Sequence, residues 1–243
     1  MNILAFTKTV VVTGAAGGMG RQICAHLAAQ GWQVLAVDHN TERLQQLTES
    51  TNIRPLHIDL QAADLCDQVL AQLDGCPPLK GLVNLAGVSI GAPIERLAAE
   101  DWDMSFAINV RPAFLLIQAL AAHLRQGGGG SIVNVGSPVG LIGARKPSYA
   151  ASKAALQGLT MSCARNLGAD QIRVNMLLPG PTVTEMTKDW SPERCQSVAE
   201  GSFLKRLCQP QEIAEVIEFL LSPASRYITG SIVDMTAGSM YGH

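Results

Sequence analysis

The chain has 243 residues, of which 47% are hydrophobic and 16% are charged, and its formal net charge is −2. This composition allows a large buried core and is unlike that of a disordered protein. The sequence has no basic block, so we expect no nucleic-acid partner and no electrostatic capture by a membrane. The N-terminal residues 1–7 are too short to form a signal peptide. The apolar stretch at 113–124 is interrupted by Gln118 and His123 and is too short to cross a bilayer.

The six cysteines and five histidines are scattered along the chain. The cysteines form no CxxC pair and the histidines no HxxxH pair, so the sequence offers no metal site. We interpret the cysteines as reduced thiols, which are typical of a cytoplasmic protein.

Apolar runs alternate with helical patterns from one end of the chain to the other. Short apolar runs predict strands at 9–12, 33–37, 53–58, 81–85, 131–135, 172–178 and 231–235. Helical patterns predict helices at 18–30, 41–50, 62–73, 101–125, 149–167 and 211–221. Strands that are apolar on both faces and alternate with helices predict a parallel sheet covered on both sides. We therefore expect an α/β fold with a Rossmann-type, doubly wound sheet of about seven strands, built as a single domain over residues 1–243.

A glycine-rich segment, Thr13-Gly14-Ala15-Ala16-Gly17-Gly18-Met19-Gly20, follows the first strand and opens the first helix. Glycines permit a tight turn there and let the backbone approach a pyrophosphate at the helix N-terminus. A merely glycine-rich turn is the alternative, but the strand before it and the helix after it favour a dinucleotide site. Gly14, Gly18, Met19 and Gly20 are the expected contacts.

Acidic residues follow the second and third strands. A carboxylate at Asp38 can accept hydrogen bonds from the adenosine ribose and would repel a 2′-phosphate, which favours NAD over NADP. The nearest basic candidate, Arg43, is expected on the following helix. Asp38 could instead cap the next turn. Asp59 and Leu60 are expected at the adenine, although Asp59 could equally cap the next helix.

The segment Tyr149-Ala150-Ala151-Ser152-Lys153 is predicted to be helical, which places the tyrosine and the lysine on one face, one turn apart. A lysine ammonium beside a phenol favours the phenolate and is expected to lower the pKa of Tyr149. Tyr149 would then serve as a general acid and base for an alcohol or carbonyl oxygen. An exposed pair without function is the alternative interpretation.

Taken together, these motifs resemble the short-chain dehydrogenase/reductase family over nearly all of the chain. The glycine segment matches TGxxxGxG, the segment 84–87 (Asn-Leu-Ala-Gly) matches NNAG with Leu85 in place of the second Asn, and Tyr149 to Lys153 matches YxxxK. The resemblance implies an oxidoreductase that acts on CH–OH groups with a nicotinamide coenzyme, and Asp38 favours NAD over NADP in that role. It also implies a catalytic tetrad of Asn109, Ser137, Tyr149 and Lys153.

The same resemblance implies a role for each member. Tyr149 exchanges a proton with the substrate oxygen, Ser137 hydrogen-bonds that oxygen, Lys153 holds the nicotinamide ribose, and Asn109 holds a water that connects Lys153 to solvent. An ordinary structural role is the alternative for Asn109 or Ser137 taken singly. Tyr149 and Lys153 are thereby also coenzyme contacts, and further ones are implied at Asn84, Ala86, Gly87, Pro179, Gly180, Thr182 and Thr184.

Substrate choice is implied to come from two apolar loops and a lid at about 181–207, with Ser137, Val139, Tyr149 and Trp190 as substrate contacts. The first interpretation is an NAD-dependent secondary-alcohol dehydrogenase. A 3-oxoacyl-acyl-carrier-protein reductase that uses NADPH is the alternative, and a non-catalytic nucleotide-binding regulator is a third. The family resemblance also implies a homotetramer or homodimer.

Overall fold

The computed structural model describes residues 7–47, 52–184 and 187–240. Its strands are β1 (Lys8–Thr13), β2 (Trp32–Asp38), β3 (Ile53–His57), β4 (Leu79–Asn84), β5 (Gly130–Val135), β6 (Ile172–Pro179) and β7 (Ile232–Met235). Its α-helices are α1 (Gly18–Ala29), α2 (Thr41–Gln45), α3 (Leu65–Leu70), α4 (Ala99–Asn109), α5 (Arg111–Gln126), α6 (Val139–Ile142), α7 (Pro147–Leu167), α8 (Pro192–Glu200) and α9 (Pro210–Leu221). Short 3-10 helices lie at Ile94–Arg96, Gly168–Asp170 and Pro223–Ser225.

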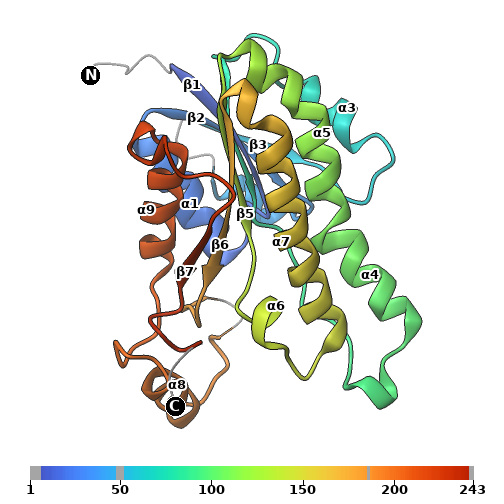
Figure 1. Cartoon of the computed structure of the whole chain (residues 1–243), viewed down its shortest axis with the longest axis vertical. Coiled ribbons are helices and arrows are strands. Elements are labelled where there is room, and N and C mark those ends of the chain that lie inside the picture. Colours follow the sequence, from blue (N-terminus) through green and yellow to red (C-terminus); the bar gives the residue numbers. More distant parts are fainter. Residues whose placement is uncertain (1–6, 48–51, 185–186, 241–243) are drawn as a thin grey trace.

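All seven strands form one parallel sheet in the order β3-β2-β1-β4-β5-β6-β7. Helices α1 and α9 cover one face, whereas α3, α5 and α7 cover the other (Figure 1). Alternate side chains of β1 serve the two layers, since Val10 and Val12 pack on the α1 and α9 side and Val11 packs on the other. The prediction of a doubly wound, Rossmann-type sheet is therefore confirmed.

The helix predicted at 101–125 is wrong in one respect, because the structure divides it into α4 and α5. Val110 separates them with φ −121° and ψ −53°, outside the helical region, and Pro112 lies in the first turn of α5. Proline has no N–H to donate and its ring clashes with the carbonyl four residues earlier, so a continuous helix is broken at this point. The break places Asn109 at the last residue of α4.

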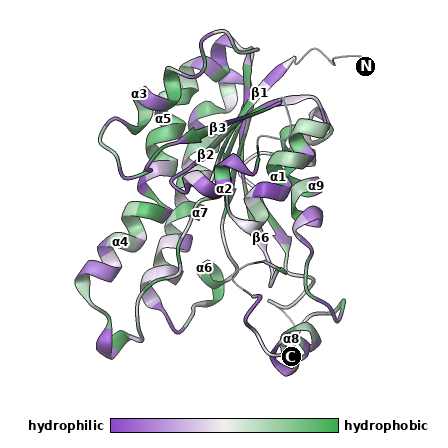
Figure 2. Ribbon diagram, turned by 180° about the vertical axis from the view of Figure 1, so that it is seen from behind, coloured by the Kyte–Doolittle hydropathy of each residue, from purple (hydrophilic) through white to green (hydrophobic). Residues whose placement is uncertain are grey.

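The combined stretch Ala99–Gln126 has the length and apolar composition of a membrane-spanning helix. In the fold, however, the apolar side chains of α5 belong to the core: Leu116, Leu120 and Leu124 are fully buried against the sheet. Figure 2 shows that the strands between the two helix layers are mostly hydrophobic. Helix α5 covers one face of these strands. The α5 segment is therefore a core helix of this α/β fold.

Other boundaries differ from the predictions at the ends of elements. The helix predicted at 62–73 is shorter, spanning only Leu65–Leu70, because turns occupy both flanks. The helix predicted at 41–50 begins as expected but ends at Gln45, and residues 48–50 lie outside the described residues. Helix α8, within the predicted lid, was not expected. Its cap is Ser191, whose side chain accepts a hydrogen bond from the Arg194 backbone N–H.

Candidate active site

A cavity of about 500 Å³ opens at the carboxyl ends of β1 and β4. The strand order reverses between these neighbours, since β2 and β3 extend to one side and β5 to β7 to the other. In doubly wound sheets such a switch point leaves a crevice where ligands bind. Ten of the predicted coenzyme contacts line this cavity: Gly14, Gly18, Met19, Gly20, Asp38, Asp59, Leu60, Ala86, Gly87 and Thr184.

The turn after β1 fits a dinucleotide pyrophosphate. Gly14 has φ +68°, and a Cβ added to it would lie 2.8 Å from the Ala86 Cα, so only glycine is accommodated. A Cβ on Gly20 would lie 2.1 Å from the Gly14 carbonyl oxygen. The N-cap of α1, Gly17, provides no side-chain hydrogen bond, and the first turn contains no acidic residue. The N–H groups and positive end of α1 are therefore directed at the site without a competing carboxylate from the first turn of the helix itself.

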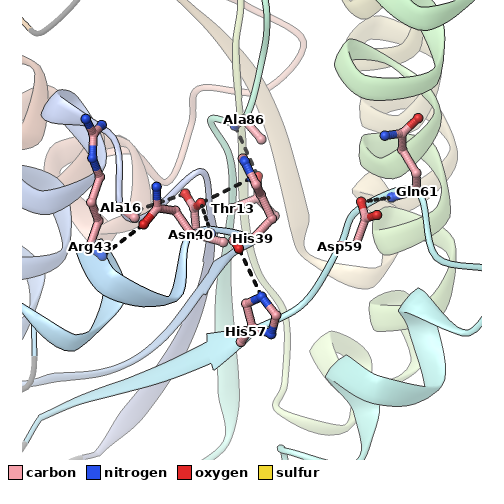
Figure 3. Close-up of polar contacts among 10 residues, drawn as sticks. Thr13, Ala16, His39, Asn40, Arg43, His57, Asp59, Gln61 and Ala86 are labelled. Atoms are coloured by element: carbon pink, nitrogen blue, oxygen red, sulfur yellow. Dashed lines mark hydrogen bonds and ion pairs between the residues drawn. The ribbon is translucent and has the colours of Figure 1, made fainter.

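Asp38 lies at the end of β2 and lines the same cavity. One carboxylate oxygen accepts a hydrogen bond of 3.0 Å from the Ala16 N–H of the glycine-rich turn, and the other accepts one of 3.0 Å from the Asn40 N–H. Asp38 therefore does cap the next turn, as the alternative held, but it also joins that turn to the glycine-rich segment. Figure 3 shows Ala16, His39, Asn40 and Arg43 gathered around this point.

Asp59 follows β3 and also lines the cavity. Its carboxylate accepts a hydrogen bond of 2.9 Å from the Gln61 N–H, and Figure 3 shows the two residues side by side. The alternative that Asp59 caps the next helix is wrong, because α3 begins at Leu65 and its N-cap position is Asp64. Asp59 instead holds the turn that forms one wall of the cavity.

Besides the tetrad residues, four of the predicted coenzyme contacts are not among the cavity-lining residues: Asn84, Pro179, Gly180 and Thr182. The side chain of Asn84 is buried and donates a hydrogen bond of 2.8 Å to the Asn134 side chain. Pro179 ends β6, and a Cβ on the following Gly180 would lie 2.9 Å from the Thr236 Cα. Thr182 is also buried, and its hydroxyl donates to the Gly180 carbonyl at 2.8 Å.

The four residues of the predicted tetrad converge beside the cavity. Tyr149 and Lys153 lie one turn apart on α7, and the Lys153 Nζ is 5.9 Å from the centroid of the Tyr149 ring. Ser137, which follows β5, lies close enough to the Tyr149 phenol for its side chain to lower the Tyr149 pKa. A Cβ added to Gly87 would lie 3.1 Å from the Lys153 Nζ and 3.3 Å from the Asn109 Oδ1. Gly87 thus forms the boundary between the cavity and the tetrad.

The expected effect of Lys153 on Tyr149 is not found. Burial raises the pKa of the Tyr149 phenol, and the neighbouring Ser137 side chain lowers it only in part. Lys153 is itself buried, which lowers its pKa to about 8, and its ammonium donates a hydrogen bond of 3.0 Å to the Val135 carbonyl. The prediction considered the charge of the lysine but not the desolvation of both groups, which dominates in this site.

Asn109 is held through every polar atom of its side chain. Its Oδ1 accepts from the Val88 N–H at 2.8 Å, and its Nδ2 donates to the Val88 carbonyl at 3.0 Å and to the Ser152 Oγ at 2.9 Å. Ser152 in turn donates to the Tyr149 carbonyl at 2.8 Å. The side chain of Asn109 therefore ties the loop after β4 to α7, and Ser152 is a contact that the sequence reasoning missed.

The predicted substrate contacts lie on different elements. Val139 begins α6, directly after Ser137, whereas Trp190 precedes α8 in the lid and its ring packs under the Arg194 guanidinium at 4.3 Å. Thr184 is the lid residue that lines the coenzyme cavity, and residues 185 and 186 of the lid lie outside the described residues. Two further cavity residues, His39 and Arg43, were not predicted as contacts. The sequence signal for His39 was its place immediately after the β2 carboxylate, and that for Arg43 was its place in the first turn of the following helix.

Comparison with known proteins agrees with this geometry. The family model for short chain dehydrogenases matches residues 8–194. The chain is 35% identical to (3R)-3-hydroxyacyl-CoA dehydrogenase from Rattus norvegicus, with 94% of each chain covered. It is 34% identical to 3-oxoacyl-acyl-carrier-protein reductase FabG from Thermotoga maritima, with 95% of this chain and 97% of that protein covered.

A solved structure of a short-chain type dehydrogenase/reductase from Mycobacterium ulcerans superimposes with a TM-score of 0.91 at 28% identity. That match covers 98% of this chain and 92% of the other. The sequence motifs, the sheet order, the coenzyme cavity and these relatives lead to one assignment. The chain belongs to the short-chain dehydrogenase family and is an oxidoreductase that uses a nicotinamide coenzyme on CH–OH groups.

Proposed function

We propose that this protein interconverts a secondary alcohol and a ketone with NAD(H), and that Tyr149 is the general acid and base. The observation that carries the proposal is the position of the Ser137 side chain, close enough to the Tyr149 phenol to lower its pKa, next to a buried lysine. Because the Tyr149 and Ser137 hydroxyls lie beside each other, both can reach the oxygen of a bound alcohol or carbonyl. The arrangement suits a reaction in which that oxygen gains or loses a proton.

The bound coenzyme would supply the hydride, and the chain's own residues would handle binding and the proton. In the reducing direction, Tyr149 donates its phenolic proton to the carbonyl oxygen while Ser137 hydrogen-bonds that oxygen. In the oxidising direction, the phenolate accepts the hydroxyl proton. Burial raises the pKa of Tyr149, so alcohol oxidation should be favoured at alkaline pH and ketone reduction near neutral pH.

Lys153 and Asn109 complete the proposed tetrad. The Lys153 ammonium reaches the wall of the coenzyme cavity at Gly87, where it can bind the nicotinamide ribose. The side chain of Asn109 is committed to Val88 and Ser152, so we propose that it fixes this wall. The water that Asn109 is expected to hold between Lys153 and solvent stays part of the proposal. Pro179, Gly180, Thr182 and Thr184 remain the proposed contacts for the carboxamide.

We propose NAD as the preferred coenzyme because the Asp38 carboxylate lines the adenosine end of the cavity. A carboxylate at this position can accept from the ribose hydroxyls and repels a 2′-phosphate. Arg43 also lines this cavity, although a residue on the next helix was not expected to reach it. Its positive charge is the feature of the cavity that favours NADP. A 3-oxoacyl-acyl-carrier-protein reductase that uses NADPH is the second candidate, and its reductase activity is supported by the name of one relative.

The proposal also covers the oligomeric state, the cellular location and the domain organisation of the protein. We propose a homotetramer or homodimer because the two predicted interface segments, the helices expected at 101–125 and 149–167, expose large apolar side chains that a partner subunit could cover. Trp102 of α4, Phe114 of α5 and Met161 of α7 are 40%, 45% and 51% exposed. A cytoplasmic location is supported by the six cysteines, which are all free. One domain over residues 1–243, with a lid at about 181–207, is supported by the single sheet.

The test is paired titration with NADH and NADPH, followed by turnover of a panel of secondary alcohols and 3-oxoacyl thioesters. Tyr149→Phe removes only the phenolic oxygen, and Tyr227→Phe at a fully exposed tyrosine is the matched control. We expect Tyr149→Phe to bind NADH like the wild type and to lose turnover by at least about a hundredfold. Unchanged turnover in Tyr149→Phe would overturn the catalytic assignment, and coenzyme binding without turnover of any substrate in the panel would favour the regulatory role.

A further inference from the structure

The start of α7 holds the loop after β4 through the backbone of that loop. The Ser148 Oγ donates a hydrogen bond of 3.1 Å to the Ile90 carbonyl, and the Lys146 Nζ donates one of 2.7 Å to the Ser89 carbonyl. The Lys146 contact is exposed, whereas Ser148 is fully buried. A buried hydroxyl that loses its partner is costly, so the fold maintains the contact with Ile90. Because Ser148 directly precedes Tyr149, it joins this loop to the residue proposed to move the proton.

The backbone of the loop is shaped to admit this contact at Gly91, the residue after Ile90. Gly91 has φ +97°, and a Cβ added to it would lie 2.5 Å from the Ser148 Oγ. A side chain at position 91 would therefore be strained by its own backbone and would displace the serine hydroxyl. The close approach depends on both partners, since α7 provides a buried hydroxyl and the loop provides a residue without a side chain.

The same loop forms part of the wall of the coenzyme cavity. Val88 lines that cavity, and Asn109 at the end of α4 binds both its N–H and its carbonyl. Asn109 is joined in turn to Ser152 of α7, and α4 and α7 lie side by side (Figure 1). The loop is therefore tied to α7 on both sides of Tyr149, by Ser148 before it and through Ser152 after it.

We propose that Ser148 is a positioning residue for the reaction: by holding the loop after β4 at Ile90, it sets the place of the cavity wall relative to Tyr149. The inference rests on the proposed function, because it requires Tyr149 as the general acid and base and a nicotinamide coenzyme against this wall. Ser148 is not among the described residues that line the coenzyme cavity, so it acts through the loop and through the start of α7.

A positioning role affects the chemical step and not the binding of the coenzyme. The contacts proposed for the pyrophosphate and the adenosine come from the glycine-rich turn and from Asp38, which follow β1 and end β2. Removing the Ser148 hydroxyl leaves those contacts in place, so NADH affinity should be unchanged. Reacting groups must be held at about 3–3.5 Å, and a misplacement of about 1 Å can cost about a hundredfold in rate. The rate of hydride transfer should therefore fall.

The experiment compares the wild type with Ser148→Ala in single turnovers of the full-length protein, with the coenzyme limiting and NADH absorbance as the signal. The substrate is the secondary alcohol or 3-oxoacyl thioester that the wild type turns over fastest. The amplitude counts folded, active enzyme, whereas the rate constant reports the chemical step. Ser105→Ala is the matched control, because Ser105 is also fully buried but donates to the Asp101 carbonyl of its own helix at 2.8 Å. Both variants lose one buried hydroxyl and one hydrogen bond, so their stability should fall to a similar degree.

We expect the rate constant of Ser148→Ala to be at least about tenfold below that of the wild type at unchanged NADH affinity, and that of Ser105→Ala to match the wild type. Lys146→Met removes the exposed donor to Ser89 without disturbing a buried residue. It should lower the rate constant by at least about threefold, and it decides the question if Ser148→Ala does not fold.

Two results would overturn the inference and leave the proposed function intact. One is a wild-type rate constant in Ser148→Ala, with or without a reduced amplitude, or in Lys146→Met where Ser148→Ala does not fold. The other is weaker NADH binding by Ser148→Ala that accounts for its slower turnover, because the residue would then act on binding. If the wild type itself turns over no substrate of the panel, the proposed function fails instead.

Discussion

Lys153 should make the folded protein less stable than it would be without the lysine. Its ammonium is buried, and burial lowers its pKa from the usual 10.5 to about 8. A tenfold change in a proton-binding constant corresponds to about 1.4 kcal/mol, so the buried charge costs about 3 kcal/mol of folding free energy at neutral pH. Replacing it in Lys153→Met removes this cost but leaves the Val135 carbonyl without its 3.0 Å donor, a loss of about 1 kcal/mol.

The net expectation for Lys153→Met is a gain of about 2 kcal/mol in the free energy of unfolding at pH 7, together with loss of turnover. The sign of the pH dependence follows from linkage. Between about pH 8 and 10.5 the unfolded chain holds a proton on Lys153 that the folded protein does not, so the wild type becomes more stable as the pH rises. Relative to the variant, the wild type should gain about 1.4 kcal/mol in the free energy of unfolding for each pH unit across this window.

The assay is urea denaturation of the coenzyme-free protein at pH 7, 8, 9 and 10, with wild type and variant compared at each pH. Other groups titrate in this window, but they contribute equally to both proteins and cancel in the difference. Lys205→Met, which removes an exposed lysine whose ammonium donates to the Glu200 carbonyl, is the control and should show no such slope. A difference that stays constant from pH 7 to 10 would refute the argument from burial.

Two further predictions concern the neighbouring parts of the site. Gly14→Ala should lower NADH affinity by at least about tenfold, because the residue has φ +68° and its new Cβ would lie 2.8 Å from the Ala86 Cα. NADH affinity is measured by fluorescence titration. If the variant binds NADH as tightly as the wild type, the turn is not a tight fit. Ser137→Ala removes a side chain that lowers the pKa of Tyr149, so the limb of the alcohol-oxidation profile on which the rate rises with pH should move to higher pH. A shift of this rising limb to lower pH in the steady-state rates would contradict the role of Ser137.

The periodicity of the sequence was sufficient to predict the seven-stranded sheet, because its strands are apolar on both faces and bounded by clear helical patterns. It was not sufficient to place the division between α4 and α5, since apolar spacing continues across Val110. Pro112 was the readable signal for that break. Helix α8 had a comparable signal, because Ser191 and Pro192 form a standard N-terminal cap ahead of a polar segment.

The positions of the tetrad followed from sequence motifs, but its electrostatics did not. Spacing shows that Tyr149 and Lys153 share a helix face, and this was confirmed. Spacing cannot show how far each group is removed from water, which depends on parts of the fold distant in sequence, such as the end of β5 at Val135 and the loop after Asn84 at Gly87. Desolvation raises the pKa of Tyr149 and lowers that of Lys153, so the two groups are tuned by the fold and not by their sequence separation.

Asn84 shows how a motif residue at the edge of a ligand site can also act on the site through a neighbouring helix. It pairs in register with Asn134 on the adjacent strand, so the two side chains emerge on the same face of the sheet. Asn84 donates to Asn134 at 2.8 Å, and Asn134 donates to the Thr160 hydroxyl on α7 at 2.9 Å. Because α7 also carries Tyr149 and Lys153, this buried chain fixes the rotation of the catalytic helix relative to the strands that form the coenzyme cavity. The polar residue at position 84 thus acts on the site by positioning α7.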